Sequence, residues 1–364
     1  MKIMFFLIQI LLFVQMVFTN SIENNCNILS LSGGGSFGAL EIGILSSVMT
    51  GPAYKQIDPV YKQVDPVYKQ VDPVYKQIDS VYKQIDSVYK QIDPVYKQVD
   101  PVYKQIDPVY KPFDPKLMTG VSVGGLNVGY LSHFRDINEG IRKLRDIYIN
   151  MKNDDVYEFN FIEKSRLSFY DTTPLRNTIK KILLPLNKQV IPAIVGSTNL
   201  YTGYMDIFNL EDYSIEDKVK VLMSTSAIPI VFPPIELNNS LYVDGGIISN
   251  SIINGIDHIV KCNTYDITYI STSPSLETDV RNNITNIYDY TKRVVEVIKY
   301  DFNNELAEIK NFYCSPKTTS KININYCFPT YNNLYKYSIL DFTKGEELFN
   351  IGKTYNNCTM IHLC

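Results

Sequence analysis

The stretch Leu117-Met118-Thr119-Gly120-Val121-Ser122-Val123-Gly124-Gly125-Leu126-Asn127 decides the fold. A short apolar run leads into Gly120-Val121-Ser122-Val123-Gly124, which has the GxSxG spacing of a nucleophile elbow. In such an elbow the chain turns sharply from a strand into a helix at the serine, and the glycines relieve the crowding of the tight turn. The same spacing arises by chance in chains that contain much Gly and Ser. The stretch therefore predicts a strand, a turn and a helix, and by itself leaves the role of Ser122 open.

A second glycine-rich turn lies upstream, at Ser32-Gly33-Gly34-Gly35-Ser36-Phe37-Gly38. The apolar residues 28–31 predict a buried strand before it, and residues 39–45 predict a helix after it. Glycines in such a turn let backbone N–H groups approach a phosphate or a developing oxyanion. The first, third and last glycines also fit the GxGxxG fingerprint of a dinucleotide site, which requires an acidic residue about 20 positions later. A repeat occupies that position, so the dinucleotide interpretation is disfavoured.

A third cluster is Leu241-Tyr242-Val243-Asp244-Gly245-Gly246, in which a predicted strand ends in an aspartate. Two glycines after the aspartate allow another backbone segment to pass close to it. Asp-Gly is also a common hairpin signal, so the cluster taken alone favours a simple turn.

A serine nucleophile needs a base, and the chain has three histidines. His133 follows Ser122 by 11 residues, which places it about 16 Å away if both lie on one helix. His258 has the pattern of a surface residue at the end of a helix, and His362 lies in the C-terminal tail. None stands in an obvious catalytic loop, although a Ser–Asp–His triad that uses His258 is one alternative.

Two further blocks lie between the second and third clusters. They are Ile194-Val195-Gly196-Ser197-Thr198-Asn199-Leu200-Tyr201-Thr202-Gly203 and Ser224-Thr225-Ser226-Ala227-Ile228-Pro229-Ile230-Val231-Phe232-Pro233-Pro234. With Gly-Gly-Gly-x-x-Gly, GxSxG and Asp-Gly-Gly in the same order, they closely resemble the patatin-like phospholipase family. The resemblance covers about residues 26–275 and is interrupted by the repeat.

The resemblance implies a three-layer α/β/α sandwich around a mostly parallel sheet. It implies that Ser122 is the nucleophile and that Asp244 is its proton acceptor in a Ser–Asp dyad, with no metal ion or cofactor. The N–H groups of Gly33, Gly34 and Gly35 would form the oxyanion hole. The glycines of the matching motifs that would support these loops are Gly38, Gly120, Gly124, Gly245 and Gly246.

The implied activity is hydrolysis of lipid esters, of phospholipid or neutral lipid, during transient contact with a membrane or another lipid surface. A catalytically inactive fold of the same family that binds through the repeat is the non-enzymatic alternative. Phe37 stands where the family usually has Lys or Arg, which removes a cation for a phosphate headgroup and favours neutral lipids or other esters. Val121 and Val123 are bulkier than the small residues usual beside the serine, and Asn250 is followed by Ser251 instead of the frequent proline.

Composition and repeats set the domain organisation. Of the 364 residues 45% are hydrophobic and the net charge is −3, which supports a sizeable core and argues against a nucleic-acid-binding protein. Residues 54–116 form nine units of the pattern Tyr-Lys-Gln-Ile/Val-Asp-Pro/Ser-Val, of which the last (residues 110–116) diverges, and seven of the nine units contain proline. Because proline breaks helices, we expect this segment to be extended or disordered, as an insertion into a single catalytic domain of residues 26–290. Its place between the two glycine-rich loops makes it a candidate lid or interaction arm.

Residues 1–19 have the single cation, apolar run and small-residue exit of a secretory signal peptide, with an uncleaved membrane anchor as the alternative. Six cysteines follow, and in a secreted chain they predict disulfides. The expected local pairs are Cys314 with Cys327 and Cys358 with Cys364, and the spacing does not favour a metal site. Residues 291–364 are expected to form a C-terminal extension, helical at first (apolar residues recur at helical spacing within 286–312) and then braced by disulfides.

Overall fold

A computed structural model gives the structure of the chain. It describes residues 23–49, 113–159, 167–186, 188–253, 256–272, 320–331 and 333–363. The chain divides into two compact units, one made of Met1–Ser47 with Asp114–Cys364 and the other of Val48–Phe113. The predicted signal peptide, the repeat up to residue 112 and the predicted helices of residues 286–312 lie outside the described residues. Within the described ranges, no helix is long and apolar enough to cross a membrane.

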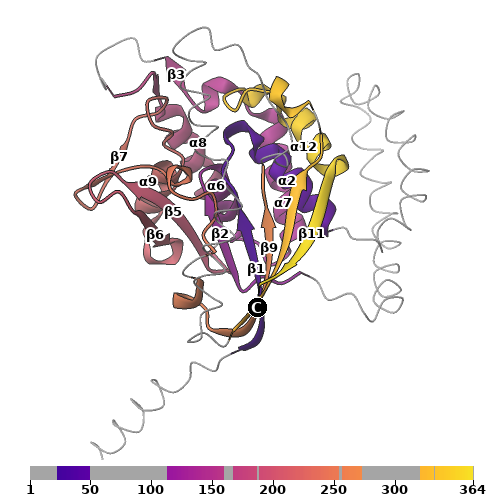
Figure 1. Cartoon of the computed structure of the whole chain (residues 1–364). Coiled ribbons are helices and arrows are strands. Elements are labelled where there is room, and N and C mark those ends of the chain that lie inside the picture. The colour runs from indigo at the N-terminus through magenta and orange to yellow at the C-terminus, as the bar shows by residue number, and fades with distance from the viewer. Residues whose placement is uncertain are drawn as a thin grey trace, which may run out of the picture. The chain divides into compact units, whose positions relative to one another are not determined.

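The described strands of the first unit form a nine-stranded sheet in the order β11-β10-β9-β1-β2-β5-β8-β7, with β6 paired to β5 beside this path. The five strands from β10 to β5 run parallel, and the pairings at both edges are antiparallel. Figure 1 shows β1, in indigo, beside β9, in orange, although β1 ends at Leu31 and β9 begins only at Cys262. The predicted α/β class with a mostly parallel sheet is therefore confirmed.

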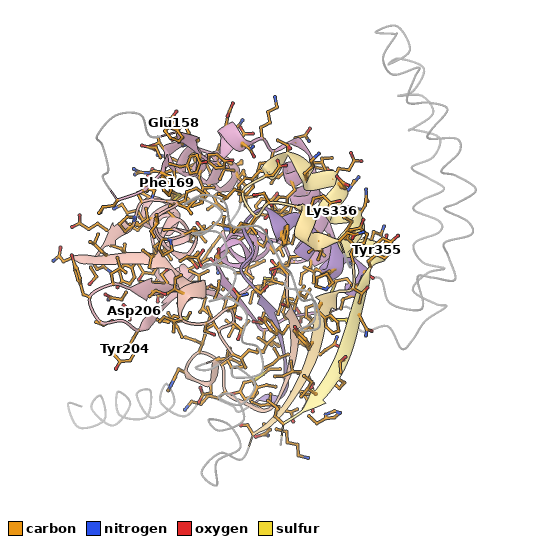
Figure 2. The ribbon with its side chains drawn as sticks, turned by 45° about the horizontal axis from the view of Figure 1, so that its top comes forward. Glu158, Phe169, Tyr204, Asp206, Lys336 and Tyr355 are labelled. Carbon is orange, nitrogen blue, oxygen red and sulfur yellow. A yellow bond between two sulfur atoms is a disulfide. The ribbon has the colours of Figure 1, made fainter. Side chains whose placement is uncertain are left out.

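The strands match the apolar runs of the sequence. The described strands are β1 Glu23–Leu31, β2 Leu117–Val121, β3 Glu158–Phe159, β4 Tyr170–Asp171, β5 Ala193–Asn199, β6 Met205–Asn209, β7 Ile235–Leu237, β8 Ser240–Asp244, β9 Cys262–Ile270, β10 Lys321–Pro329 and β11 Asn356–His362. All residues of β2 and β5 are buried, as expected for central parallel strands that are covered on both faces. β5 and β6 form a hairpin, and Tyr204 at its turn is 74% exposed (Figure 2).

The described helices form a connected layer that packs on the sheet through α6 and α9. The α-helices are α2 Gly38–Met49, α6 Val123–Leu131, α7 Ile137–Asn150, α8 Thr173–Leu183, α9 Ile215–Thr225 and α12 Gly345–Thr354. The 3-10 helices are η1 Gly35–Phe37, η2 Asn153–Asp155, η3 Leu210–Asp212, η4 Gly245–Ile247, η5 Ile256–His258, η6 Leu334–Lys336 and η7 Phe342–Lys344. Asp136 and Ser214 begin α7 and α9, and their side chains accept hydrogen bonds from the first turn.

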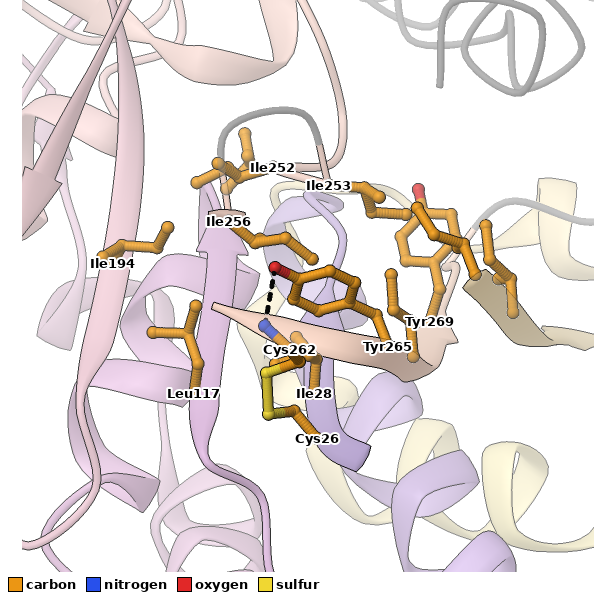
Figure 3. Close-up of a cluster of buried hydrophobic side chains, with 14 residues drawn as sticks. Cys26, Ile28, Leu117, Ile194, Ile252, Ile253, Ile256, Cys262, Tyr265 and Tyr269 are labelled. Carbon is orange, nitrogen blue, oxygen red and sulfur yellow. Dashed lines mark hydrogen bonds between the residues drawn. A yellow bond between two sulfur atoms is a disulfide. The ribbon is translucent and has the colours of Figure 1, made fainter. Parts of the chain in front are cut away.

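The opposite face of the sheet packs against the segment around Ile252, Ile253 and Ile256 (Figure 3). Alternate residues of the strands, such as Ile28, Leu117 and others, point to this face because successive side chains of a strand point to opposite sides. The buried cluster contains Cys26, Ile28, Leu117, Val121, Ile194, Ile252, Ile253, Ile256, Cys262, Tyr265, Ile267, Tyr269, Ile322 and Ile324.

The C-terminal region differs from the prediction. β10 pairs in parallel with β9, and β11 closes that edge of the sheet, so the sheet continues beyond the predicted domain boundary at residue 290. The predicted disulfide partners of Cys327 and Cys358 were wrong, because these two cysteines are directly opposite on β10 and β11 and bond to each other. A second disulfide joins Cys26 to Cys262 at the starts of β1 and β9. Cys314 and Cys364 lie outside the described residues.

The insertion joins the sheet at the edge away from Ser122. It leaves the first unit after Ser47, near the end of α2, and returns at Asp114, just before β2 begins. β2 then runs five residues before it reaches Ser122, a distance of about 16 Å. Ser47 and Asp114 are therefore both at the amino edge of the parallel strands, and the candidate lid or interaction arm between them lies mostly outside the described residues.

Candidate active site

Ser122 occupies a strained turn between β2 and α6, as the GxSxG spacing predicts. Its φ is 54° and its ψ is −127°, a conformation that residues with a side chain rarely adopt. A side chain at Gly120 would collide with the backbone of Gly124, and a side chain at Gly124 would collide with the carbonyls of Leu31 and Ser32. Both glycines are thus required for the close approach of α6 to the ends of β1 and β2.

The strand register brings Asp244 to Ser122. Val121 of β2 is paired with Gly196 of β5, and Ser197, the next residue of β5, is paired with Asp244 at the end of β8. Ser122, one residue beyond Val121, is therefore level with Asp244. The Ser122 hydroxyl donates a 2.6 Å hydrogen bond to Asp244 Oδ2. Two residues that are 122 positions apart thus meet at one edge of the sheet.

Asp244 is held in this orientation from its other side. Its Oδ1 accepts a 2.8 Å hydrogen bond from the N–H of Gly246. A side chain at Gly245 would collide with the carbonyl of Gly196, so glycine is needed for this turn to pack on β5. The chain enters a 3-10 helix after Asp244 instead of the hairpin that Asp-Gly alone suggested. Ser122 and Asp244 are 2% and 1% exposed, so their hydrogen bond is shielded from water.

The glycine-rich turn lies directly against Ser122. A side chain at Gly33 would come within 2.8 Å of Ser122 Cβ. The N–H of Gly33, one of the three predicted oxyanion donors, instead donates a 2.8 Å hydrogen bond to Asn250 Oδ1. Among the described residues, the N–H groups of Gly34 and Gly35 have no hydrogen-bond acceptor. Gly35 has a φ of 60° and lines the same cavity as Ser122.

Two residues that contact the catalytic loops were given no role from the sequence. Thr225, at the end of α9, accepts a 3.0 Å hydrogen bond from the Ser122 N–H and donates to the carbonyl of Gly196, and so ties the elbow to α9 and β5. Asn250 fixes the glycine-rich turn as described above. Thr225 lies in the quoted block of residues 224–234, and Asn250 lies four residues after Asp244-Gly245-Gly246. A search for side chains near the motifs that can accept hydrogen bonds would have found both residues.

The histidines lie away from this pair. His258 ends η5 and is exposed, as predicted, and the exposed His362 has its Nδ1 2.7 Å from Asn323 Oδ1. His133 follows the end of α6. Within the described part of the chain, the side-chain hydrogen bonds of Asp244 go to Ser122 and Gly246, and no histidine takes part. No group of three or more potential metal ligands is present among the described residues.

A largely apolar cavity begins at Ser122 and extends between α6, α7, α8 and α9. It holds about 820 Å³ of space that is not filled by atoms, part of it open to solvent. Its described lining includes Ser122 and Gly35 at the catalytic end and contains no charged side chain.

A buried polar network forms part of the cavity wall. Asn127 of α6 donates a 2.8 Å hydrogen bond to Glu41 Oε2, and Tyr148 of α7 donates a 2.6 Å hydrogen bond to Asn127 Oδ1. Burial raises the pKa of Glu41 well above its usual value of 4.5, against the opposing effect of the bond from Asn127. Burial, reinforced by the nearby Glu41, also raises the pKa of Tyr148. The network links the helix after the glycine-rich turn to the helix after the elbow.

Comparison with known proteins agrees with this geometry. Residues 110–256 match the family model described as patatin-like phospholipase, a range that contains Ser122 and Asp244 and begins after the glycine-rich turn. No curated protein matches the chain significantly. Among solved structures, the crystal structure of VipD from Legionella pneumophila is similar at 10% identity over 93% of this chain and 68% of that chain, with a TM-score of 0.32 that is too low to bear on the fold. The family indicates lipid acyl hydrolase activity. Residues 110–256 of the chain are therefore similar to the patatin-like phospholipase family.

Proposed function

We propose that the protein is a serine acyl hydrolase that cleaves ester bonds of lipids with Ser122 as nucleophile and Asp244 as its proton acceptor. One observation carries the proposal: the Ser122 hydroxyl, at the strained turn between β2 and α6, donates a 2.6 Å hydrogen bond to the buried carboxylate of Asp244. A nucleophile needs a base within this distance to remove its proton as attack proceeds. The start of α6 directly after Ser122 adds the positive end of a helix dipole.

The reaction has two steps. In the first step, Ser122 Oγ attacks the ester carbonyl carbon, Asp244 takes the hydroxyl proton, and the carbonyl oxygen becomes an oxyanion. When this intermediate collapses, the bond to the alcohol breaks and Asp244 returns the proton to the departing alcohol oxygen. In the second step, water attacks the acyl-enzyme and gives its proton to Asp244. When the second intermediate collapses, the bond to Ser122 Oγ breaks and Asp244 returns the proton to Oγ, which releases the fatty acid and regenerates the Ser122 hydroxyl.

The oxyanion would be stabilised by the backbone of the glycine-rich turn. We assign the donor role to Gly34 and Gly35, because the N–H of Gly33 is engaged by Asn250. Gly35 also lines the cavity beside Ser122. An oxyanion donor of this kind contributes roughly 3–4 kcal/mol to transition-state stabilisation.

The cavity behind Ser122 supports a lipid substrate. Its lining is apolar and uncharged, so it fits an alkyl chain and excludes a headgroup. Phe37 replaces the expected cation in the glycine-rich turn, which favours neutral lipids or other esters over phospholipids. The substrate would be reached through transient contact with a lipid surface.

The two disulfides support the predicted secretory route. Cys26–Cys262 and Cys327–Cys358 join elements that are distant in sequence, and such bonds persist in oxidising compartments. An N-terminal segment retained as a membrane anchor is the alternative to a cleaved signal peptide.

The two rival functions differ in their requirements. A Ser–Asp–His hydrolase would need His258, which is exposed and makes no hydrogen bond to Asp244 among the described residues. A catalytically inactive fold that binds through the repeat would not need Ser122 at all.

The test is hydrolysis of a panel of p-nitrophenyl esters, monoacylglycerol, triacylglycerol and phosphatidylcholine. We expect Ser122→Ala and Asp244→Asn each to lower kcat by about 10³-fold or more, since members of one catalytic unit fail together. His258→Ala is the matched control and should retain wild-type rates. Loss of activity in His258→Ala would favour the triad, and an inactive but folded wild type would favour the binding fold.

A further inference from the structure

The four helices around the cavity alternate in direction relative to Ser122. α6 runs away from the elbow, and α7 returns toward it, because a side chain at Gly38 would collide with both Tyr148 of α7 and Val123 of α6. α9 ends near the site, since Ala227 just beyond it accepts a hydrogen bond from the Asp244 N–H. Lys180, late in α8, forms an ion pair with Glu216 at the start of α9, so α8 runs away from the site. The cavity thus follows the axis of an antiparallel four-helix arrangement.

This arrangement identifies the end of the cavity that is farthest from Ser122. On each helix, the lining residue most distant from the catalytic end is Tyr130 of α6, Leu144 of α7, Leu183 of α8 or Leu222 of α9. We call these four residues the cavity floor. All are at most 6% exposed, and the Tyr130 ring packs on Phe134 with centroids 5.1 Å apart. Tyr130 follows Ser122 by eight residues, which corresponds to about 12 Å along the helix.

From this geometry we infer that the cavity floor, with Tyr130 as its bulkiest member, limits the length of the acyl chain that the enzyme accepts. The inference rests on the proposed function. An acyl chain attached at the Ser122 end would extend between the helices toward the floor. Each added methylene gains buried apolar area until the chain end meets Tyr130, so the rate should rise with chain length and then fall.

The neighbours of Tyr130 explain why its ring forms a fixed boundary. The ring lies between Phe134 on one side and the cavity on the other, near the end of α6. A close-packed aromatic ring cannot move aside without leaving a void, and it has few alternative rotamers in a helix. A smaller side chain would extend the cavity along its axis, and a larger side chain at Leu183 would shorten it.

The experiment measures kcat/KM for p-nitrophenyl esters of even chain lengths from acetate to palmitate. We expect Tyr130→Leu to move the optimum to longer chains and Leu183→Phe to move it to shorter ones, with roughly a fourfold change in relative kcat/KM per methylene gained or lost. Tyr269→Leu is the matched control, because Tyr269 is equally buried but belongs to the cluster on the opposite face of the sheet. Its chain-length profile should be that of the wild type.

Three outcomes would overturn the inference in distinguishable ways. A folded wild type that hydrolyses no ester of any length overturns the proposed function and the floor together. An active wild type whose profile is the same in Tyr130→Leu and Leu183→Phe overturns the floor alone. A shift in Tyr269→Leu as large as that in Tyr130→Leu would show that the profile reports general loosening and would also overturn it. If Tyr130→Leu does not fold, Leu183→Phe decides in the same way.

Discussion

The two faces of the sheet use apolar residues differently. On the helical face, α6, α7, α8 and α9 line a largely apolar cavity that begins at Ser122 and is partly open to solvent. On the opposite face, a cluster that includes Ile267, Tyr265 and Tyr269 fills the space between the strands and the segment around Ile252 (Figure 3). Similar apolar side chains thus line a cavity on one face of the sheet and form a packed core on the other.

The difference between the two faces shows where the protein loses stability in order to keep features that its function needs. The helical face carries the strained turn at Ser122 and the buried network of Glu41, Asn127 and Tyr148. The named cluster on the opposite face is apolar apart from its tyrosine hydroxyls and contains the Cys26–Cys262 disulfide. Backbone strain, empty space and buried carboxyl groups all reduce stability. We therefore infer that the face with the packed apolar cluster contributes the stability that offsets the cost of these features on the helical face.

The largest expected effect is on the free energy of unfolding, which we compare between one truncated side chain on each face of the sheet. Ile267→Ala removes a side chain from the filled face and should lower the free energy of unfolding by about 2–5 kcal/mol. Ile179→Ala, at the cavity wall, should cost clearly less, because the side chain already faces empty space and has fewer contacts to lose. Urea unfolding of the two variants measures the difference. Equal losses would remove the distinction between the two faces.

The next prediction tests the close approach of α6 to the end of β1 beside Ser122. Gly124→Ala places a methyl group against the carbonyls of Leu31 and Ser32 and should lower kcat/KM by at least about 100-fold through displacement of Ser122. Gly203→Ala is the control, since Gly203 has a positive φ but no atoms within 4 Å of the added group. It should cost about 1 kcal/mol of stability and leave activity unchanged. Wild-type activity in Gly124→Ala would contradict the claim that the elbow needs glycine at this position.

Asn250 lies just before Ile252 and Ile253, which pack in the apolar cluster, and its side chain accepts a hydrogen bond from the glycine-rich turn of the active site. Asn250→Ala removes the acceptor for the Gly33 N–H, and we expect kcat to fall by about tenfold with little change in KM, because the turn that offers Gly34 and Gly35 would relax. Asn323→Ala removes a comparable side-chain bond, to Asp266, at another part of the sheet and should retain full kcat. Unchanged kcat in Asn250→Ala would mean that the turn holds its shape without this bond.

The smallest effect is the pH dependence that the buried network confers. Because the pKa of Glu41 is raised in the folded protein, its contribution to stability is complete below the unfolded value of 4.5 and is lost as the pH rises toward the folded pKa. Glu41→Gln cannot ionise, so it should gain stability relative to the wild type above pH 4.5, by at most about 1.4 kcal/mol per pH unit. Unfolding measured between pH 5 and pH 8, roughly the range of greatest stability, tests this. A constant difference across that range would show that Glu41 does not titrate with folding.

The local elements of the fold could be predicted because they depend on local chemistry, whereas the pairing of Ser122 with Asp244 was implied by the family resemblance and is made by the register of β2, β5 and β8. Glycines are required where backbones approach closely, and these positions carry recognisable motifs at Gly120, Gly124 and Gly245. The predicted strand of residues 28–31 lies within β1, and the predicted helix of residues 39–45 lies within α2.

The remaining features depend on contacts between distant residues. The pairing of β10 with β11 places Cys327 opposite Cys358 and so decides this bond, whereas spacing along the chain favoured nearer cysteines. The alternation of Ile322, Ile324 and Tyr326 in β10 was a period-two signal for a strand in the supposed extension. The cavity arises from four helix packings together, which no local pattern encodes.

The measurement that tests the account most directly is covalent labelling of the folded protein with a serine-directed fluorophosphonate, followed by mapping of the labelled peptide. The account predicts stoichiometric labelling of Ser122 in the wild type, none in Ser122→Ala, and strongly slowed labelling in Asp244→Asn, whose neutral amide cannot take the proton from Oγ. Failure of the folded wild type to react, labelling at another serine, or wild-type labelling rates in Asp244→Asn would contradict it.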